Sequence, residues 1–426
     1  MKVIVASWQL VSSLLCFSQI PSLIQPKKYS KDPQADIRLL FVTTGLGTGG
    51  AERMLVKLLS ALKSPQIECS VVSLLDSGTQ GPILRNLGVP VHELHINSVE
   101  GLLSVIWRLQ KIVRNFKPDI IQGWMYHGNL AACYAWLGTR TRSRLFWGVR
   151  HSFMGMKCER PMTRLVIRVG AILSRFPTYV IFNSQLSRNQ HEALGFCSGR
   201  NVVIPNGFLV WHFRPNTEAR AEMRRALGIS PEAPVVGMVA RDHPMKDHAT
   251  FLNAAALVLK QCPSAVFVLA GPGIDRSNFR LVFMIKQLGI GESVRLVGEV
   301  TDTEFLYPAF DVLGLSSWAE AFPNVLGEAM ACGIPCVATD VGDARQIIGD
   351  TGYVVSPSCP AELATKLLVI LSVEKTDYAI LSKRARQRIR EHYSLDRIAN
   401  CFRNVYASFN LDRIRRAGHS ETAYEP

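Results

Sequence analysis

The sequence predicts an α/β protein with two Rossmann-like, doubly wound domains that face a central cleft. Its 426 residues exceed the roughly 250–300 at which a single hydrophobic core stops growing. From Ile37 onward, short apolar runs alternate with helical periods, which is typical of a parallel sheet covered by helices. The alternation pauses once and then restarts, so the chain contains two consecutive α/β halves.

The first half begins with a buried strand over 37–42 and an amphipathic helix over 51–62. Further strands are predicted over 70–75, 120–123, 145–149 and 180–183. The half ends with the strand and Pro-Asn-Gly turn of 202–207, and an irregular interdomain linker continues to Pro215.

The second half repeats this pattern, with strands predicted over 234–240, 265–270, 294–297, 312–315 and 335–338. In doubly wound sheets, ligands bind beyond the carboxyl ends of the strands. We therefore expect the chemistry to lie in loops that follow strands, on both sides of the cleft. The chain beyond Asn410 is polar and is predicted to be loose.

The formal net charge of +14 predicts an anionic partner, either a phosphate-rich ligand or a membrane surface. No zinc-finger spacing, basic zipper or aromatic RNA-binding signature occurs, so a nucleic-acid partner is not expected. The ten cysteines include no Cys-x-x-Cys pair, which favours a reducing, cytoplasmic compartment. Beyond the apolar first stretch, residues 1–24, no segment of the sequence reaches the ~18 uninterrupted apolar residues of a transmembrane helix.

The strongest signal is the segment 320–328, where an irregular entry leads into a helix. If the helix begins near Pro323, its free amide groups form a site for a diphosphate. Glu320 and Glu328 would lie about 12 Å apart, which suits a sugar contact for Glu320 and a ribose contact for Glu328. An alternative is that Glu328 is a solvent-exposed helix residue and Glu320 a partner of the helix dipole. The donor-binding candidates of this segment are Phe322, Pro323, Asn324, Val325 and Glu328.

Two cations, Arg241 and Lys246, follow the first strand of the second half. A departing nucleoside diphosphate gains negative charge as its glycosidic bond breaks, and two cations can stabilise that charge. Arginine offers a fork of donors and lysine a point charge. Ordinary exposed loop charges are the alternative.

A glycine-rich turn over 45–50 joins strand to helix in the first half, and Gly49 and Gly50 let the backbone approach a phosphate or acceptor closely. The turn also satisfies Gly-x-Gly-x-x-Gly, so a nicotinamide-dependent dehydrogenase is an alternative. The acid expected about 20 residues later has no clean match, since only Glu68 and Asp76 are available.

Two histidines, His127 and His151, follow strand ends of the first half, and Asn129 lies beside the former. A lone histidine is more often structural, but this position favours contact with an acceptor or sugar. The spacing offers no metal triad and no Asp-x-Asp pair, so neither a metal nor another cofactor is predicted.

With these residues in view, the chain resembles the glycosyltransferases of family 4, which have the GT-B fold. The resemblance extends from about Ile37 to Tyr406 and rests on four motifs: Gly-Gly-Ala-Glu at 49–52, Ile-Pro-Asn-Gly at 204–207, Arg241 with Lys246, and the segment 320–328. It implies that His151, Arg241, Lys246 and Glu320 act at the reacting centre. It also implies that Gly271 and Val300 lie near the nucleotide base.

The resemblance further implies how the chain is divided. An acceptor-binding domain is expected over 37–207 and a sugar-nucleotide-binding domain over 208–394. A helix over 395–410 returns to the first domain, and a polar tail follows over 411–426. The segment 1–36 has no counterpart in the family pattern and is a leader of uncertain role: a secretory signal, a membrane-associating leader and a start codon assigned too early remain open.

The expected function is retaining transfer of a hexose or N-acetylhexosamine from a nucleoside-diphosphate sugar to an acceptor. The basic first domain and the resemblance favour a lipid-linked saccharide acceptor in polysaccharide or cell-wall synthesis, at the inner face of an anionic membrane. A soluble acceptor fits the donor motifs equally well. A sugar-nucleotide epimerase on the same fold, a dehydrogenase and a non-catalytic sugar-nucleotide-binding module are the alternatives.

Overall fold

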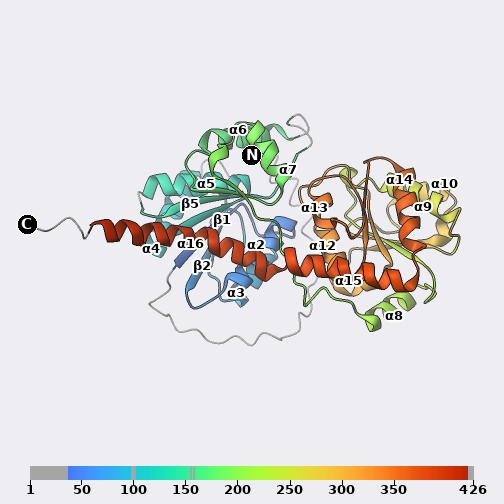
Figure 1. Cartoon of the computed structure of the whole chain (residues 1–426). Coiled ribbons are helices and arrows are strands. Elements are labelled where there is room, and N and C mark those ends of the chain that lie inside the picture. Colours follow the sequence, from blue (N-terminus) through green and yellow to red (C-terminus); the bar gives the residue numbers. More distant parts are fainter. Residues whose placement is uncertain (1–36, 97–101, 140, 154–155, 157–158, 421–426) are drawn as a thin grey trace, which may run out of the picture.

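The computed structural model describes residues 37–96, 102–139, 141–153, 156 and 159–420, and it contains two α/β domains (Figure 1). The predicted leader 1–36 and the last part of the predicted tail, 421–426, lie outside the described residues. Each domain has its own parallel sheet with helices on both faces, which confirms the predicted fold class.

The first domain contains a seven-stranded sheet in the order β3-β2-β1-β4-β5-β6-β7, with every neighbouring pair parallel. Its strands are β1 Ile37–Thr43, β2 Ile67–Ser73, β3 Val91–Glu93, β4 Ile120–Trp124, β5 Arg144–Val149, β6 Tyr179–Phe182 and β7 Asn201–Val203. Central strands β1 and β4 are mostly apolar because helices cover both faces of the sheet.

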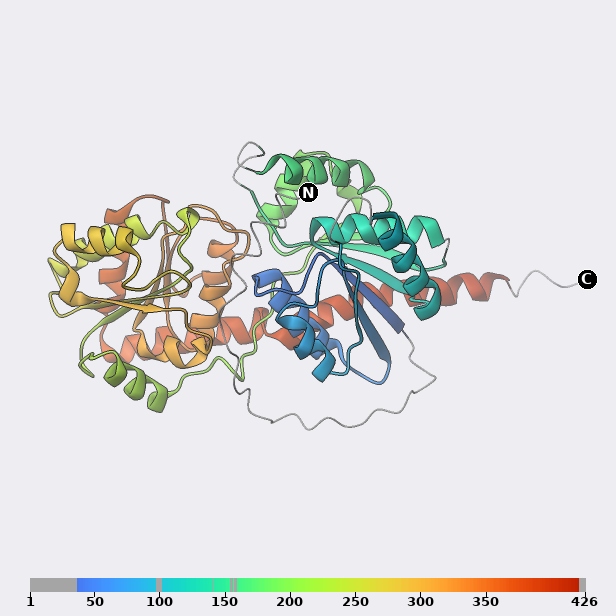
Figure 2. The same cartoon turned by 180° about the vertical axis from the view of Figure 1, so that it is seen from behind.

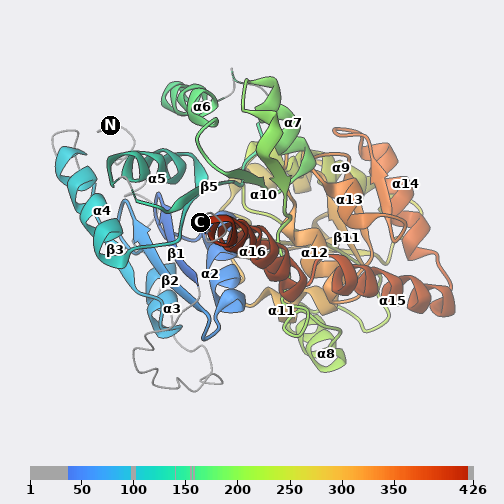
Figure 3. The ribbon, with the colours of Figure 1, turned by 60° about the vertical axis from the view of Figure 1, so that its left-hand side comes forward.

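The helices of the first domain form two layers with separate cores. One core contains α2 Gly50–Leu62, α3 Gln80–Asn86 and the first part of α16 Leu395–Ser420. The other contains α4 Leu102–Phe116, α5 Met125–Thr139 and α6 Pro161–Leu173, and α7 Gln185–Ala193 follows β6. Figure 3 shows α2 beside α16.

The second domain contains a six-stranded parallel sheet in the order β10-β9-β8-β11-β12-β13. Its strands are β8 Val235–Val239, β9 Val266–Ala270, β10 Val294–Gly298, β11 Val312–Leu315, β12 Cys336–Thr339 and β13 Tyr353–Val355. One face packs against α9 His248–Leu259, α10 Phe279–Gln287 and α14 Pro360–Leu371. The other packs against α8 Thr217–Ala226, α11 Thr303–Leu306, α12 Asn324–Ala331, α13 Ala344–Ile348 and α15 Lys375–His392.

The chain crosses between the domains twice, and the two crossings are hydrogen-bonded to each other. The amide of Phe208 donates to Tyr393 O at 2.9 Å, and the amide of Leu395 donates to Phe208 O at 2.8 Å. After the second crossing, α16 runs along the first domain, as Figures 1 and 2 show from opposite sides. The helix continues to Ser420, past the expected end at 410.

Candidate active site

The predicted motifs follow the strands at which the order of each sheet reverses. In the first sheet these are β1 and β4, which lead into the glycine-rich turn and into α5. In the second they are β8 and β11, which lead into the Arg241–Lys246 loop and the segment 320–328. Such switch points are where doubly wound sheets bind ligands. The two domains therefore each contribute one binding edge.

Glu320 and Lys246 are in direct contact, although the sequence assigned them to separate loops. The ammonium of Lys246 donates to Glu320 Oε1, and the hydroxyl of Ser317 donates to the same oxygen at 2.8 Å. The Glu320 side chain is only 13% exposed. Partial burial strengthens this pair relative to a solvated one, so the carboxylate is held in one orientation beside a cation.

Glu328 lies one helical turn inside α12, and both of its oxygens have partners. The hydroxyl of Tyr307 donates to Oε2 at 2.9 Å, while Lys57 Nζ from α2 of the first domain lies 3.8 Å from Oε1. Burial and the neighbouring Glu328 raise the pKa of Tyr307 above its usual value, which keeps the phenol a donor. Oε1 therefore has an ion-pair partner but, among the described residues, no hydrogen-bond donor.

The remaining residues of the segment 322–325 do not all face a ligand. Pro323 caps α12, as predicted, and the half-buried side chain of Asn324 is at the first position of the helix. Phe322, predicted to bind the donor, instead points into the second domain's core, where its ring stacks 6.2 Å from that of Phe208. Val325 also packs against this core. Aromatic burial outweighs exposure of these side chains in a polar cleft.

Two predicted residues of the nucleotide-base wall have structural roles in the second domain. Gly271 has φ +147°, and a side chain there would place Cβ 2.2 Å from Ala240 O, so only glycine lets this loop pass β8. Val300 is partly buried against the core. Arg241, by contrast, is exposed beside this passage, at the carboxyl end of β8.

His151 follows β5 and lies close to the second domain. Its Nε2 is 3.0 Å from Glu159 Oε1, and its ring meets that of Tyr126 edge-on at 6.0 Å. The hydrogen bond with His151 holds the pKa of Glu159 below its usual value. The next residue, Ser152, donates from its hydroxyl to the backbone oxygen of Glu320 at 2.7 Å. His151 and Glu320 are therefore brought to the same place from different domains.

The turn from β4 into α5 separates the other two acceptor-side candidates. Met125 takes the left-handed conformation at φ +65°, and His127 is exposed in the first turn of α5. Asn129, predicted to contact acceptor or sugar, is instead buried: its Nδ2 donates to Gly148 O at 3.2 Å and its Oδ1 accepts from Gly148 N at 3.1 Å. Both ends of the amide are used to fasten α5 to β5, because a buried amide requires partners.

The glycine-rich turn faces the start of α12. Gly49 caps α2 and Gly50 begins it, and both are exposed. A Cβ added to Gly50 would lie 3.4 Å from Asn324 Nδ2, whereas one added to Gly49 would overlap the folded-back carboxylate of Glu52. The N-termini of α2 and α12 are thus adjacent across the domain boundary.

Sequence reasoning missed several residues that connect the domains, among them Lys57, Arg150 and Asn206. Lys57 lies at a solvent-facing helical position in the sequence, and Arg150 has no acidic neighbour that would mark an ion pair. Asn206 was seen only as part of a turn. The Ile-Pro-Asn-Gly motif was the one available signal for Asn206.

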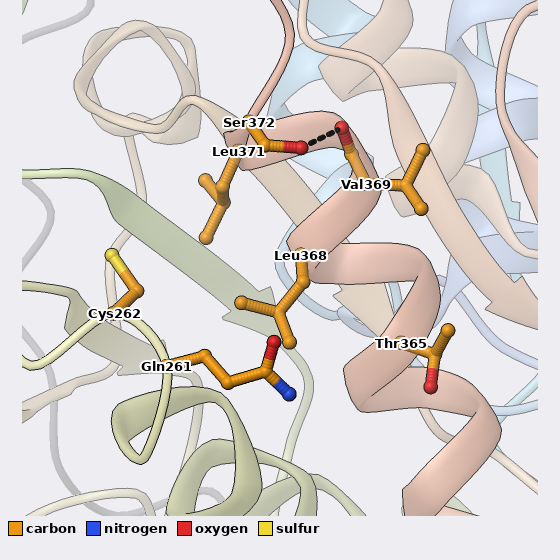
Figure 4. A pocket seen from close by; sticks show the side chains of 7 residues that line it. All are labelled: Gln261, Cys262, Thr365, Leu368, Val369, Leu371 and Ser372. Atoms are coloured by element: carbon orange, nitrogen blue, oxygen red, sulfur yellow. Dashed lines mark hydrogen bonds between the residues drawn. The ribbon is translucent and has the colours of Figure 1, made fainter.

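One surface hollow lies away from these residues. A depression of about 440 Å³ follows the end of α9 and borders α14, and its lining includes Gln261, Cys262, Thr365 and Leu368 (Figure 4). No charged side chain lines it. A phosphate-bearing ligand would find no cationic partner among these lining residues, so the motif residues between the domains remain the candidate site.

Comparison with known proteins agrees with this arrangement. Residues 48–208 match the model for Glycosyltransferase Family 4, and residues 219–388 match that for Glycosyl transferases group 1. The fold, with one parallel-sheet domain on each side of these motifs, is of the GT-B type. Because the two models together match most of the chain, the chain belongs to the family 4 type, which confirms the resemblance seen in the sequence.

The curated relatives match only part of this chain. A D-inositol 3-phosphate glycosyltransferase of Nocardia farcinica is 30% identical over 210 residues, covering 47% of this chain and 46% of the relative. An N-acetyl-alpha-D-glucosaminyl L-malate synthase of Bacillus anthracis is 26% identical over 187 residues, covering 43% and 48%. The chain spans about half the length of the curated relatives it matches.

A solved structure extends the likeness in fold to both domains. HepE of Anabaena, in complex with UDP and glucose, superimposes with a TM-score of 0.74 at 23% identity. The match covers 87% of this chain and 100% of that chain.

Proposed function

We propose that this protein transfers a hexose or N-acetylhexosamine from a nucleoside-diphosphate sugar to an acceptor, with retention at the anomeric carbon. The observation that carries the proposal is that Glu320 and Glu328 flank the start of α12, with Lys246 on the sugar side and Gly50 opposite. Helix amides and cations suit the diphosphate, and the two carboxylates suit hydroxyl groups on either side of it.

In the proposed reaction, the acceptor hydroxyl attacks the face from which the diphosphate departs. The leaving phosphate oxygen accepts the proton of that hydroxyl, while Arg241 and Lys246 neutralise the growing negative charge. Glu320 orients the donor sugar, and His151, which Glu159 orients, contacts it from the first domain. The protein contributes mainly position and charge. Neither a metal nor a cofactor enters the proposal, and full activity in excess chelator is the expected result.

The same proposal assigns acceptor binding to residues 37–207 and donor binding to 208–394, with His127 on the acceptor side. The charged motifs that suit a diphosphate, Arg241 with Lys246 and the start of α12, both belong to the second domain. The first domain presents glycines and histidines at its sheet edge instead, which suits a neutral or variable acceptor.

A lipid-linked acceptor at an anionic membrane surface is favoured by one face of the first domain. Helix α6 exposes Met162, Leu165 and Ile172 at helical spacing, with Arg168 exposed among them. Such a mixture of apolar and basic side chains suits the interfacial layer of an anionic bilayer. On α15 of the second domain, by contrast, Arg386 and Arg388 donate to backbone carbonyls. Within the described residues, no helix is both long and apolar enough to cross a bilayer.

A vesicle assay tests this membrane contact. Binding to anionic vesicles should weaken as salt rises, because surface attraction is screened over about 8 Å at physiological ionic strength. Leu165→Asp should weaken it further, whereas Ile380→Asp, which changes an exposed apolar residue of the second domain, should not. Equal effects of both changes, or binding that ignores salt, would overturn the proposed contact.

The decisive test of the activity is a panel of sugar nucleotides with saccharide, lipid-linked and small soluble acceptors, analysed by mass. Transfer gives an acceptor heavier by one sugar. An epimerised donor, reduction of a nicotinamide cofactor, or binding without any product would each reject transfer in favour of another activity.

A further inference from the structure

A buried arginine that no carboxylate of the described residues contacts lies under the candidate site. Arg150 follows β5 and is 7% exposed. Its guanidinium carbon lies 4.5 Å from the ring centroid of Trp124 and 5.5 Å from that of Phe402 on α16. Within the described part of the chain, its Nε and Nη2 have no hydrogen-bond partner. Burial lowers the pKa of Arg150 to about 9. A charge kept here at such a cost of desolvation calls for a role.

The nitrogen of Arg150 that does have partners points to the interdomain linker. Arg150 Nη1 donates to Asn206 Oδ1 at 2.9 Å, with Ile204 O at 3.4 Å. Asn206, itself buried, donates from Nδ2 to Asn324 Oδ1 at 2.8 Å. Two hydrogen bonds thus run from the core of the first domain, through the linker, to the first residue of α12.

The donor and acceptor roles in these two hydrogen bonds are fixed by the groups that take part. A guanidinium only donates, so Asn206 must present its oxygen to Arg150 and its amide nitrogen to Asn324. Asn324 must then present its oxygen to Asn206. Its own nitrogen is left on the other side, where a Cβ on Gly50 would lie 3.4 Å away.

That side is the space between the N-termini of α2 and α12. Trp124, which supports the guanidinium of Arg150, also donates from its indole to Ala51 O at 2.9 Å. The aromatic partner of Arg150 therefore fastens the first turn of α2 as well. Arg150 and Trp124 together therefore support both the glycine-rich turn and the amide of Asn324.

We propose that Arg150 and Asn206 are positioning residues that orient the amide of Asn324 so that its N–H group donates to the donor's diphosphate. The proposal deepens the function proposed above and rests on it. The amide of Asn324 adds a side-chain donor to the backbone amides of α12, facing an anion. Without Arg150, the hydrogen bond between Asn206 and Asn324 would form equally well with either amide as the donor.

Asn206→Asp is the sharpest test, because it keeps the size of the side chain but replaces its amide donor with a second acceptor oxygen. A carboxylate accepts from both neighbours, so Asn324 must turn its nitrogen toward Asp and its oxygen toward the diphosphate. Affinity for UDP, measured by calorimetry, should fall about 10- to 100-fold. The melting temperature should not fall, since Arg150 gains a charged partner. Asn216→Asp, at a helix cap of the second domain, is the matched control and should change neither quantity.

Asn324→Ala removes the amide that the proposal orients. It lies at a half-buried surface position, and UDP affinity should fall about three- to tenfold, because a donor is lost without a repulsive oxygen being added. In the Asn324→Ala background, Asn206→Asp should then change affinity by less than about twofold. A loss of the same size in both backgrounds would overturn the proposed route through Asn324, as would full affinity in Asn206→Asp or in Asn324→Ala.

The experiment also separates this inference from the function on which it rests. UDP, GDP, ADP and inorganic pyrophosphate are each titrated into the unchanged protein first. Binding of none of them would overturn the proposed function and the diphosphate role of Asn324 with it. Binding that is indifferent to Asn206→Asp would overturn only the positioning role.

Discussion

The two domains share one topology but fix the side chains of their binding edges in different ways. In the second domain, Lys246 and Ser317 of the same domain hold Glu320. Tyr307, also of that domain, holds Glu328. In the first domain, Gly123 and Gly128 admit close backbone contacts, and Asn129 fastens α5 to β5. Polar and charged side chains therefore organise the edge of the second domain, whereas close backbone packing organises that of the first.

This difference indicates which half determines which step. An edge whose charged groups are already in place can stabilise charge that develops on a donor without reorganising. An edge built by close backbone packing can change its loops without losing its support. We therefore expect changes at the charged groups of the second domain's edge to affect catalysis and nucleotide affinity, and changes at the closely packed Gly123, Gly128 and Asn129 of the first domain's edge to affect stability.

Glu320→Gln should give the largest effect. Turnover should fall about 100-fold, because the donor sugar loses an oriented partner at the reacting centre. Inhibition by free nucleoside diphosphate should stay nearly unchanged, since that product no longer carries the sugar. Steady-state kinetics with and without added nucleotide measures both quantities. Weaker nucleotide inhibition would assign Glu320 to the nucleotide rather than to the sugar.

Glu328→Gln should act on the nucleotide instead. The ribose hydroxyls lose a charged acceptor worth about 1.5–3 kcal/mol, so free nucleoside diphosphate should inhibit about 10- to 100-fold less well. Inhibition constants measured beside those of Glu320→Gln make the comparison direct. If both variants raise the constant equally, the division of roles along the donor is wrong.

Asn129→Ala tests the corrected role of a first-domain residue. Removing an amide that satisfies both Gly148 N and Gly148 O should destabilise the protein by about 1–3 kcal/mol. The KM for the acceptor should not change in the folded variant, because the side chain does not face the cleft. Chemical unfolding gives the first value and kinetics the second. A raised KM at unchanged stability would return Asn129 to the acceptor site.

Asp343 joins the two edges, and its predicted effect depends on pH. Its Oδ2 accepts from Gln185 N at 3.1 Å, at the start of α7. Burial raises the pKa of Asp343 to about 6 from 3.8, against the lowering effect of the Gln185 and Leu186 amides. Because the folded pKa is the higher one, this group favours folding most below pH 3.8, and that contribution is lost as pH rises through about 6.

Asn at position 343 keeps the acceptor and removes the charge. Asp343→Asn should therefore be more stable than the unchanged protein by about 1–3 kcal/mol at neutral pH, with the difference vanishing near pH 4. Melting temperatures across this range measure it. A difference that does not vary with pH would mean that the carboxyl is not titrating in contact with α7.

Much of the fold could be predicted from sequence because most strands are long apolar runs between helices. Helix α12 begins at Asn324 beside the predicted Pro323, and β11 has the predicted bounds. Strands β3 and β13 were missed, since each has only three residues, too few to show a pattern. Helix α16 extends past 410, to Ser420.

The site was predicted less completely, because sequence gives the neighbours of a residue along the chain and not across it. Glu320, Glu328 and Lys246 follow strands or begin helices, so topology alone brings them to the cleft. The direction in which Phe322 or Asn129 points depends on tertiary packing, and both turn inward. The partners Lys57, Arg150 and Asn206 come from other segments, so no local pattern identifies them.

The path of α16 has a consequence for how the chain is made. Leu395, Ile398, Ala399, Phe402 and Tyr406 complete a core whose other buried members all precede residue 205. A ribosome has therefore released the whole second domain before it supplies the last layer of the first. Until then the α2 face lacks its cover, and that exposed apolar surface is prone to aggregate in the nascent chain. Completion of the first domain therefore waits for the translation of the second, although the first domain is translated before it.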